Sequence, residues 1–245
     1  MLSTPQIPTD RGLAGRLQAV RARIDAAALG SGRTTRGVGL LAVSKGQTAQ
    51  RIEAAVALGL SAFGENYVKE ALPKIKALAG RDLCWHFIGR VQTNKTRVIA
   101  THFDWVHGID RIAIAQRLSE QRDPQLAPLN VCVQINIMGE HSKGGCSVAS
   151  APALLAAIDA LPNLKLRGLM CMLPYQASDE VQHESFGRMR KLYDATRLRG
   201  IAVDTLSMGM SDDLEAAVEQ GTTLLRIGTA LFGPRPQPAS DAPVP

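Results

Sequence analysis

The segment Val38-Gly-Leu-Leu-Ala-Val43 decides the fold. It is apolar, too short for a helix and preceded by a glycine-rich turn, so it predicts a buried strand. A helical pattern of small and apolar residues follows over 47–59, and the same alternation repeats as a strand at 60–63 and a helix at 65–78. Parallel strands need a crossover connection, which these helices supply, so the stretch predicts consecutive βαβ units.

The alternation continues through the rest of the chain. Further strands are expected at 84–88, 104–107, 129–136, 164–170, 203–207 and 223–227, and further helices at 93–100, 111–121, 151–160, 178–198 and 212–220. About eight such units in a chain of 245 residues predict an α/β fold, a single (β/α)8 barrel of the TIM type. An extra N-terminal helix precedes it at 11–29. An open, doubly wound sheet is the alternative.

We expect one domain followed by a tail. No shift in composition marks an internal boundary, so residues 1–233 are predicted to form the barrel domain. Residues 234–245 contain five prolines and are predicted to remain unfolded.

The composition excludes several classes of protein. With 45% hydrophobic and 20% charged residues, the chain is neither disordered, collagen-like nor a coiled coil. It contains no transmembrane run and no apolar secretory signal. The four cysteines are far apart and show neither disulfide nor metal-ligand spacing, so we expect a cytoplasmic protein without a metal site.

The net charge of +6 raises the question of an anionic partner. The basic residues are scattered, and aromatic residues make up only 4% of the chain, so no aromatic and basic surface for single-stranded nucleic acid is apparent. We therefore expect neither a nucleic-acid partner nor a membrane partner.

Polar or glycine-rich segments follow most of the predicted strands. The carboxyl ends of the strands form the active face of a βα barrel, so these residues are expected to meet on one rim. They include Lys45, Glu65, Asn66, His86, Asn136, Met208, Ser211, Arg226, Gly228 and Thr229.

Lys45 is the most informative residue of this set. A lysine at the inner end of an apolar strand is partly desolvated, which lowers its pKa and frees the amine to attack a carbonyl, with a Schiff base as the product. The alternative is a lysine whose ammonium group extends to solvent.

Two later segments are candidates for phosphate binding. Ser211 either caps the helix that follows it or lies where free backbone amides bind phosphate. Arg226-Ile-Gly-Thr229 supplies a glycine-containing turn after the last strand, where barrels often hold phosphate. A Schiff-base lysine facing a phosphate cradle suggests pyridoxal 5'-phosphate (PLP) as the cofactor.

Seven longer motifs carry more information than any single residue. They are Leu41-Ala-Val-Ser-Lys45, Phe63-Gly-Glu-Asn-Tyr-Val-Lys-Glu70, Trp85-His-Phe-Ile-Gly89, Gln92-Thr-Asn-Lys95, Arg167-Gly-Leu-Met170, Ser207-Met-Gly-Met-Ser-Asp-Asp213 and Arg226-Ile-Gly-Thr-Ala-Leu-Phe-Gly233. In this order, over residues 11–233, the chain resembles the YggS/PROSC family of pyridoxal phosphate homeostasis proteins. The resemblance implies a barrel similar to the N-terminal domain of bacterial alanine racemase. Arg90-Val91 and Gly144-Gly145 depart from the family's usual residues.

The resemblance also implies roles for individual residues. Lys45 would hold PLP as an internal aldimine, Arg226 would face the pyridine nitrogen, and Asn66 would lie beside the ring. Met208 would line the same pocket. The residues that would bind the phosphate are Ser211, Gly228 and Thr229.

An arginine at the pyridine nitrogen argues against strong catalysis. Arginine does not readily supply a proton, so the ring nitrogen stays neutral and the ring is a weak electron sink. In alanine racemase a second base comes with a C-terminal domain and a dimer partner, whereas this chain runs out soon after Gly233.

We therefore expect a monomeric PLP-binding protein of intracellular PLP (vitamin B6) homeostasis, without strong turnover. PLP-dependent apo-enzymes are its expected recipients. A small PLP-dependent racemase or lyase with a single lysine base is the alternative.

Other polar residues stay unassigned. Tyr67 and His86 are expected to be packing residues with satisfied polar tips. A second, looser aldehyde site is conceivable at a further lysine, and the candidates are Lys69, Lys95, Lys143 and Lys165.

Overall fold

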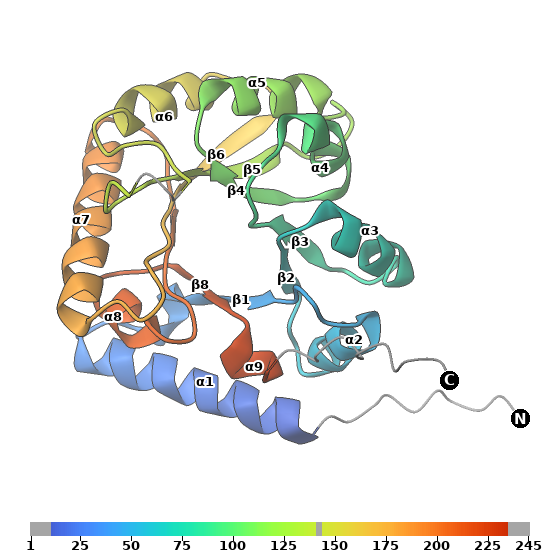
Figure 1. Ribbon diagram of the computed structural model, residues 1–245, viewed down its shortest axis with the longest axis vertical. Helices are drawn as coiled ribbons and strands as arrows, with labels where there is room; N and C mark the ends of the chain where they lie inside the picture. The colour runs from blue at the N-terminus through green and yellow to red at the C-terminus, as the bar shows by residue number, and fades with distance from the viewer. Residues whose placement is uncertain (1–10, 141–143, 235–245) are drawn as a thin grey trace, which may run out of the picture.

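Eight parallel strands close into a barrel in the order β1 to β8 in the computed structural model, which describes residues 11–140 and 144–234. The strands are Gly39–Val43 (β1), Ala62–Glu65 (β2), Cys84–Phe87 (β3), Trp105–Ile109 (β4), Leu129–Gln134 (β5), Leu164–Met170 (β6), Thr205–Ser207 (β7) and Leu224–Ile227 (β8). β1 pairs with β8 as well as with β2, which completes the ring in Figure 1. The predicted (β/α)8 barrel is confirmed, and the open sheet is wrong.

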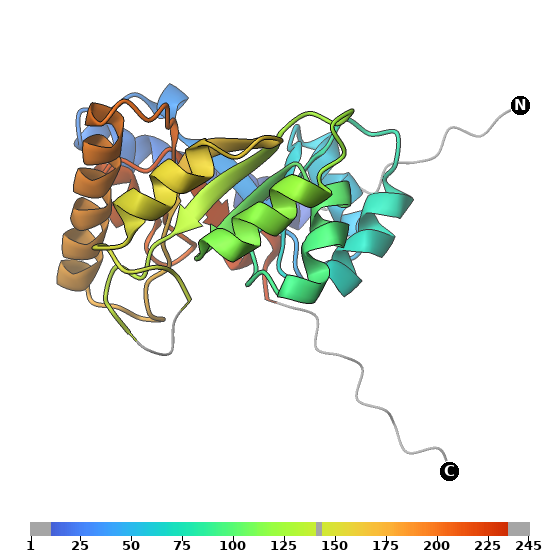
Figure 2. The same ribbon diagram turned by 90° about the horizontal axis from the view of Figure 1, so that it is seen from above.

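Helices surround the barrel (Figures 1 and 2). They are Arg11–Gly30 (α1), Ala49–Ala57 (α2), Val68–Ala77 (α3), Thr96–His102 (α4), Ile112–Gln121 (α5), Ala151–Asp159 (α6), Asp179–Leu198 (α7), Leu214–Glu219 (α8) and Thr229–Phe232 (α9). Their apolar sides join the strands in one core, as the fully buried Ile52, Leu118 and Phe186 illustrate. The short helix α9 was not predicted.

The boundary between β2 and α3 differs from the prediction. The helix expected from residue 65 begins at Val68, and Glu65 is the last residue of β2, where it pairs in register with Phe87. The Glu65 carboxylate is buried on the outer side of β2, where Ser44 and Lys74 of α3 hold it. These tertiary contacts override the local helical pattern.

The extra helix α1 lies along α8 and α9 (Figure 1). Arg23 forms an ion pair with Glu215 of α8 at 2.6 Å, and its Nη2 donates to the backbone oxygen of Ser211 at 3.0 Å. Arg16 Nε donates to the backbone oxygen of Leu231 in α9 at 2.8 Å. The N-terminal helix therefore fixes the loops that follow β7 and β8.

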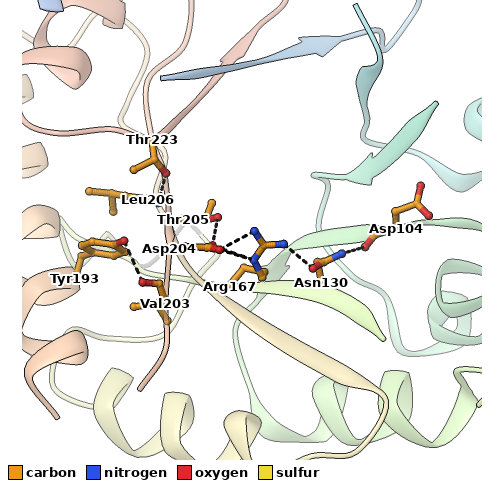
Figure 3. A network of polar contacts seen from close by, with 9 residues as sticks. All are labelled: Asp104, Asn130, Arg167, Tyr193, Val203, Asp204, Thr205, Leu206 and Thr223. Carbon is orange, nitrogen blue, oxygen red and sulfur yellow. Dashed lines mark hydrogen bonds and ion pairs between the residues drawn. The ribbon is translucent and has the colours of Figure 1, made fainter. Parts of the chain in front are cut away.

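A polar network joins four strands near their amino ends (Figure 3). Arg167 of β6 forms an ion pair with Asp204 at 2.7 Å and donates to Asn130 Oδ1 of β5 at 2.8 Å. Asn130 Nδ2 donates in turn to the backbone oxygen of Asp104, which precedes β4. The Arg167 guanidinium also lies 4.5 Å from the ring centre of Trp105. This end of a βα barrel serves stability, and the opposite end is left for function.

Neither a membrane-spanning helix nor a metal-binding cluster is found in the part of the chain that the structure describes. No helix within it is long and apolar enough to cross a bilayer. Residues 11–140 and 144–234 contain no group of three metal-ligating side chains. Residues 235–245 of the predicted tail lie outside the described residues, so the tail stays a prediction.

Candidate cofactor site

The loops after four strands bring the predicted residues to the carboxyl end of the barrel. β1 and β8 are neighbours in the sheet, with Leu41 paired to Arg226 and Ala42 to Ile227, so the residues that follow both strands lie side by side. Lys45 comes from the first of these loops, and Gly228 and Thr229 from the second. One small cavity is lined by Val43, Lys45, Gln47, Gly228, Thr229 and Gly233.

Lys45 is half-buried and follows the buried end of β1. Its loop is held from both sides, because the Ser44 amide donates to the backbone oxygen of Gly64 at 2.9 Å and the Gly46 amide donates to Glu70 Oε2 at 3.1 Å. Gly46 has φ of +72°, which a glycine adopts without strain. The backbone therefore fixes where the Lys45 side chain starts.

A charged network lies beneath this loop. Glu65 Oε1 accepts from Ser44 Oγ at 2.5 Å and from Lys74 Nζ at 2.8 Å, and Lys74 Nζ also donates to the backbone oxygen of Ser44 at 2.9 Å. Burial raises the pKa of Glu65 and outweighs the opposing effect of the Lys74 and Ser44 hydrogen bonds. We call Ser44, Glu65 and Lys74 the carboxylate network.

Ser211 connects the loop after β7 to the start of α9. Its Oγ accepts from the backbone amide of Ala230 at 3.1 Å, so it does not cap α8, whose N-cap is Asp213. The helix-cap interpretation placed Ser211 at the wrong helix. The Ser211 hydroxyl therefore lies beside the turn at Gly228 and Thr229, where α9 begins.

The space at this turn is narrow. The shared cavity measures about 20 Å³, which is room for about one water molecule. A Cβ placed on Gly228 would lie 3.5 Å from Val43 Cβ, an ordinary contact, so the turn is not tightly blocked by the strand beside it. A phosphate group needs more room than this cavity offers, so the side chains that line it would have to rearrange.

Within the described residues, two buried amide oxygens in and beside the lysine loop accept no hydrogen bond. They are Gln47 Oε1 and Asn66 Oδ1, in loops after β1 and β2, and Glu65 Oε2 of the carboxylate network is likewise without a donor. A buried carbonyl oxygen without a donor is costly, and such atoms often mark a binding site. Their position suits a ligand that carries polar donors, which fits a hydroxylated aromatic cofactor such as PLP.

Arg226 lies deeper, on β8, with 3% of its surface exposed. Its Nη1 donates to Ser207 Oγ and its Nη2 to the backbone oxygen of Cys171, both at 2.8 Å. Burial lowers the pKa of Arg226 from its high usual value. In the part of the chain that the structure describes, no carboxylate forms an ion pair with this guanidinium.

Met208 is fully buried and belongs to the main hydrophobic core. The next residue, Gly209, has φ of +93°, and a Cβ there would lie 2.5 Å from Ala217 Cβ. The backbone oxygen of Gly209 accepts from the Arg226 amide at 3.0 Å. The loop after β7 therefore packs tightly against the strand that carries Arg226.

A second, larger cavity opens beside Asn66. It measures about 630 Å³ and is lined by Asn66, Tyr67, Val68, Lys69, Leu72, Phe87, Gly89, Arg90, Gln92, Lys95 and Val98. Tyr67 is 61% exposed, so its expected role in packing is wrong. Of the lysines considered for a second aldehyde, Lys69 and Lys95 line this cavity. Lys165 lies near the amino end of β6, and Lys143 falls outside the described residues.

Comparison with known proteins identifies the family. The family model described as alanine racemase, N-terminal domain, matches residues 16–236. A Pseudomonas aeruginosa protein named pyridoxal phosphate homeostasis protein is 55% identical over 223 residues, 91% of this chain and 96% of its own length. An Escherichia coli K12 protein of the same name is 48% identical over 227 residues, 91% and 97% of the two chains. The chain belongs to the YggS/PROSC family.

A solved structure of this family extends the comparison. The structure of PipY from Synechococcus elongatus with PLP bound has a TM-score of 0.79 and 33% identity to this chain, and the match covers 90% of this chain and all of PipY. The resemblance to the YggS/PROSC family and the expected barrel are therefore confirmed. The roles of the individual site residues remain predictions.

Sequence reasoning missed the groups that surround the site residues. Lys74 and Ser207 were not singled out, and His107 was taken only as the end of a strand. One signal was present: His86 and His107 each interrupt an otherwise apolar strand in two consecutive βα units. Buried polar residues of this kind need partners, and the sequence does not show which residues supply them.

Proposed function

We propose that this protein binds PLP covalently through Lys45 and serves PLP homeostasis without strong catalytic turnover. The observation that carries the proposal is that Lys45, Gly228 and Thr229, from the loops after two paired strands, line the same small cavity. An amine and a polar turn on adjacent strands match the aldehyde and the phosphate of one small ligand. The PLP-bound family member PipY and the names of the two relatives support the same ligand.

The residues around the cavity suit this ligand. The neutral amine of Lys45 would add to the aldehyde carbon, and loss of water would leave the Schiff base. The Ser211 hydroxyl and the backbone around Gly228 and Thr229 would bind the phosphate. Asn66, with its unsatisfied oxygen, would lie beside the ring.

Arg226 supports a binding role over an enzymatic one. Bound PLP supplies an electron sink, and the strength of that sink depends on a protonated ring nitrogen. A guanidinium facing the nitrogen disfavours a second positive charge there, and Arg226 holds its proton firmly. We propose that carbanion chemistry at this site is therefore weak.

The surroundings of the site suit exchange of the cofactor. Lys45 is half-buried and Thr229 is exposed, so the ligand would be reachable from solvent and could pass to PLP-dependent apo-enzymes. All four cysteines are free thiols, which favours the reducing cytoplasm as the place of action. We take the protein to act as a monomer.

Absorbance of the purified full-length protein tests the proposal. With stoichiometric PLP, we expect a visible Schiff-base band that is lost in Lys45→Ala and retained in Lys69→Ala, a matched change at an exposed lysine beside the second cavity. A band that survives in Lys45→Ala would overturn the assignment.

Turnover is tested on the same loaded protein. Incubation with alanine and other amino acids, followed by chiral chromatography, is expected to give no more product than free PLP gives. Product formation that depends on Lys45 would establish the alternative, a small PLP-dependent racemase or lyase.

A further inference from the structure

A chain of hydrogen bonds crosses the inside of the barrel from Arg226 to His86. Arg226 Nη1 lies 2.8 Å from Ser207 Oγ, which lies 3.0 Å from His107 Nδ1, and His107 Nε2 lies 2.9 Å from His86 Nδ1. His86 Nε2 is in turn 3.3 Å from Cys84 Sγ. These residues come from β8, β7, β4 and β3, and in a ring of eight strands β8 and β7 face β4 and β3.

Arg226 determines which group donates in each of these hydrogen bonds. Arg226 only donates, so Ser207 Oγ accepts there, and its own hydroxyl proton needs another acceptor. Among the described contacts, His107 Nδ1 is the group that can take it. If His107 Nδ1 carried a proton instead, the fully buried Ser207 hydroxyl would have no acceptor, at a considerable cost in free energy.

The remaining protons are then fixed. With Nδ1 accepting, neutral His107 carries its proton on Nε2 and donates it to His86 Nδ1. His86 likewise carries its proton on Nε2 and donates toward Cys84 Sγ. Burial raises the pKa of the Cys84 thiol to about 12, so it stays a thiol.

Both histidines are held neutral by their surroundings. Burial lowers the pKa of His86 to about 3, and burial with the nearby His86 and Arg226 places the pKa of His107 well below its usual value. The charged group that acts on His86 is Arg167 of β6, which stacks on Trp105, and Trp105 stacks on His86 at 5.1 Å between ring centres. Figure 3 shows Arg167 between Asp204 and Asn130.

We propose that Ser207, His107 and His86 form a one-way hydrogen-bond relay that positions the Arg226 guanidinium, with both histidines carrying their proton on Nε2. Arg226 has no ion pair among the described residues, so its orientation rests on Ser207 Oγ and the Cys171 oxygen. Two of its five N–H groups are used in these bonds, and the others remain for a ligand. The inference rests on the proposed function only in taking Arg226 to face the ligand.

NMR of the ligand-free full-length protein tests the relay without PLP. Ring-nitrogen shifts of 15N-labelled histidine are expected to show two rings with the proton on Nε2 that stay neutral at pH 5. His183 is expected to be charged there, because its hydrogen bond to Glu219 raises its pKa. The signals would be assigned with His86→Gln and His107→Asn. A proton on Nδ1 of either buried ring, or its charging at pH 5, would overturn the relay.

A matched pair of variants tests positioning in the loaded protein. In His107→Asn the amide oxygen lies near the place of Nδ1 and still accepts from Ser207, whereas His107→Gln places its nitrogen near Nε2 and loses that acceptor. We expect the wild-type spectrum and pH profile of bound PLP in His107→Asn. In His107→Gln we expect a shifted spectrum and PLP binding weakened about ten-fold.

The outcomes separate the relay from simple packing. Equal effects of the two substitutions, or no effect of either, would show that His107 does not act through Ser207, and the positioning role would be wrong. If the wild-type protein takes up no PLP, the proposed function fails, and the NMR measurement still decides the relay.

Discussion

The carboxylate network beneath Lys45 and the relay beneath Arg226 stabilise buried charge in different ways. In the first, Glu65 and Lys74 form an ion pair at 2.8 Å, with side chains 0% and 10% exposed. In the second, the Arg226 guanidinium is held by Ser207 Oγ and the Cys171 oxygen, with two neutral histidines behind Ser207 and no carboxylate partner among the described residues. The paired charges cancel and fix a loop, whereas we propose that the unpaired charge serves a ligand.

The largest expected effect comes from breaking the ion pair. Lys74→Met leaves the Glu65 carboxylate buried without its cation, and we expect a loss of about 3–5 kcal/mol in the free energy of unfolding. Adding Glu65→Gln removes the uncompensated charge and should restore a large part of this loss. Urea unfolding followed by circular dichroism measures both variants. Equal stability of the single and double variants would show that the ion pair does not carry this cost.

The pH dependence of stability should differ in sign between the two networks. The folded-state pKa of His86 is lowered to about 3. The contribution of neutral His86 to the free energy of unfolding is therefore present at neutral pH and is lost as the pH falls below about 6.5. The folded-state pKa of Glu65 is raised. The contribution of Glu65 to the free energy of unfolding is therefore present at low pH and is lost as the pH rises above the usual pKa of a glutamate.

Unfolding experiments between pH 6.5 and 4.5 check the histidine side. We expect His86→Gln to reduce the acid-induced loss of stability by on the order of 1.4 kcal/mol per pH unit. The control is Glu65→Gln, which should not reduce the loss of stability between pH 6.5 and 4.5. The same slope in wild type and His86→Gln would contradict a neutral buried His86.

A smaller loss of stability is expected at the loop after Glu65, which is held by a close backbone contact and not by charge. A Cβ on Gly89 would lie 2.1 Å from the backbone oxygen of Asn66, so Gly89→Ala must displace the loop after Glu65. We expect a loss of about 1–3 kcal/mol and weaker PLP binding. Gly15→Ala is the control and should be neutral or stabilising, because no described atom outside the backbone of its own helix lies within 4 Å of the new Cβ. Thermal unfolding and PLP titration measure both, and an unperturbed Gly89→Ala would show that the contact is not tight.

The sequence predicts the fold well because apolar runs and turns are local signals. The strand at Leu164–Met170 is placed as predicted, and most other strands shift by one or two residues. The sequence pattern does not predict the four-residue helix α9, because this helix is shorter than the window in which a helical period can be recognised. Glu65 was assigned to a helix because its partners Ser44 and Lys74 are distant in sequence.

The site is predicted less completely than the fold. The motifs indicate Lys45, Arg226 and the turn at Gly228, because these positions lie in or just after strands that end on the same rim. They do not indicate that Ser211 accepts from α9, or that His107 reaches Ser207 one hundred residues away. Such contacts depend on the closure of the barrel, which brings strands from opposite sides of the ring into reach.

The most direct test of a covalent PLP site at Lys45 is to find which lysine carries the cofactor. The protein would be loaded with one equivalent of PLP, reduced with borohydride, digested and examined by mass spectrometry. We expect the reduced pyridoxyl group on the peptide that contains Lys45. An adduct on Lys69, Lys74 or Lys95, with Lys45 unmodified, would contradict it.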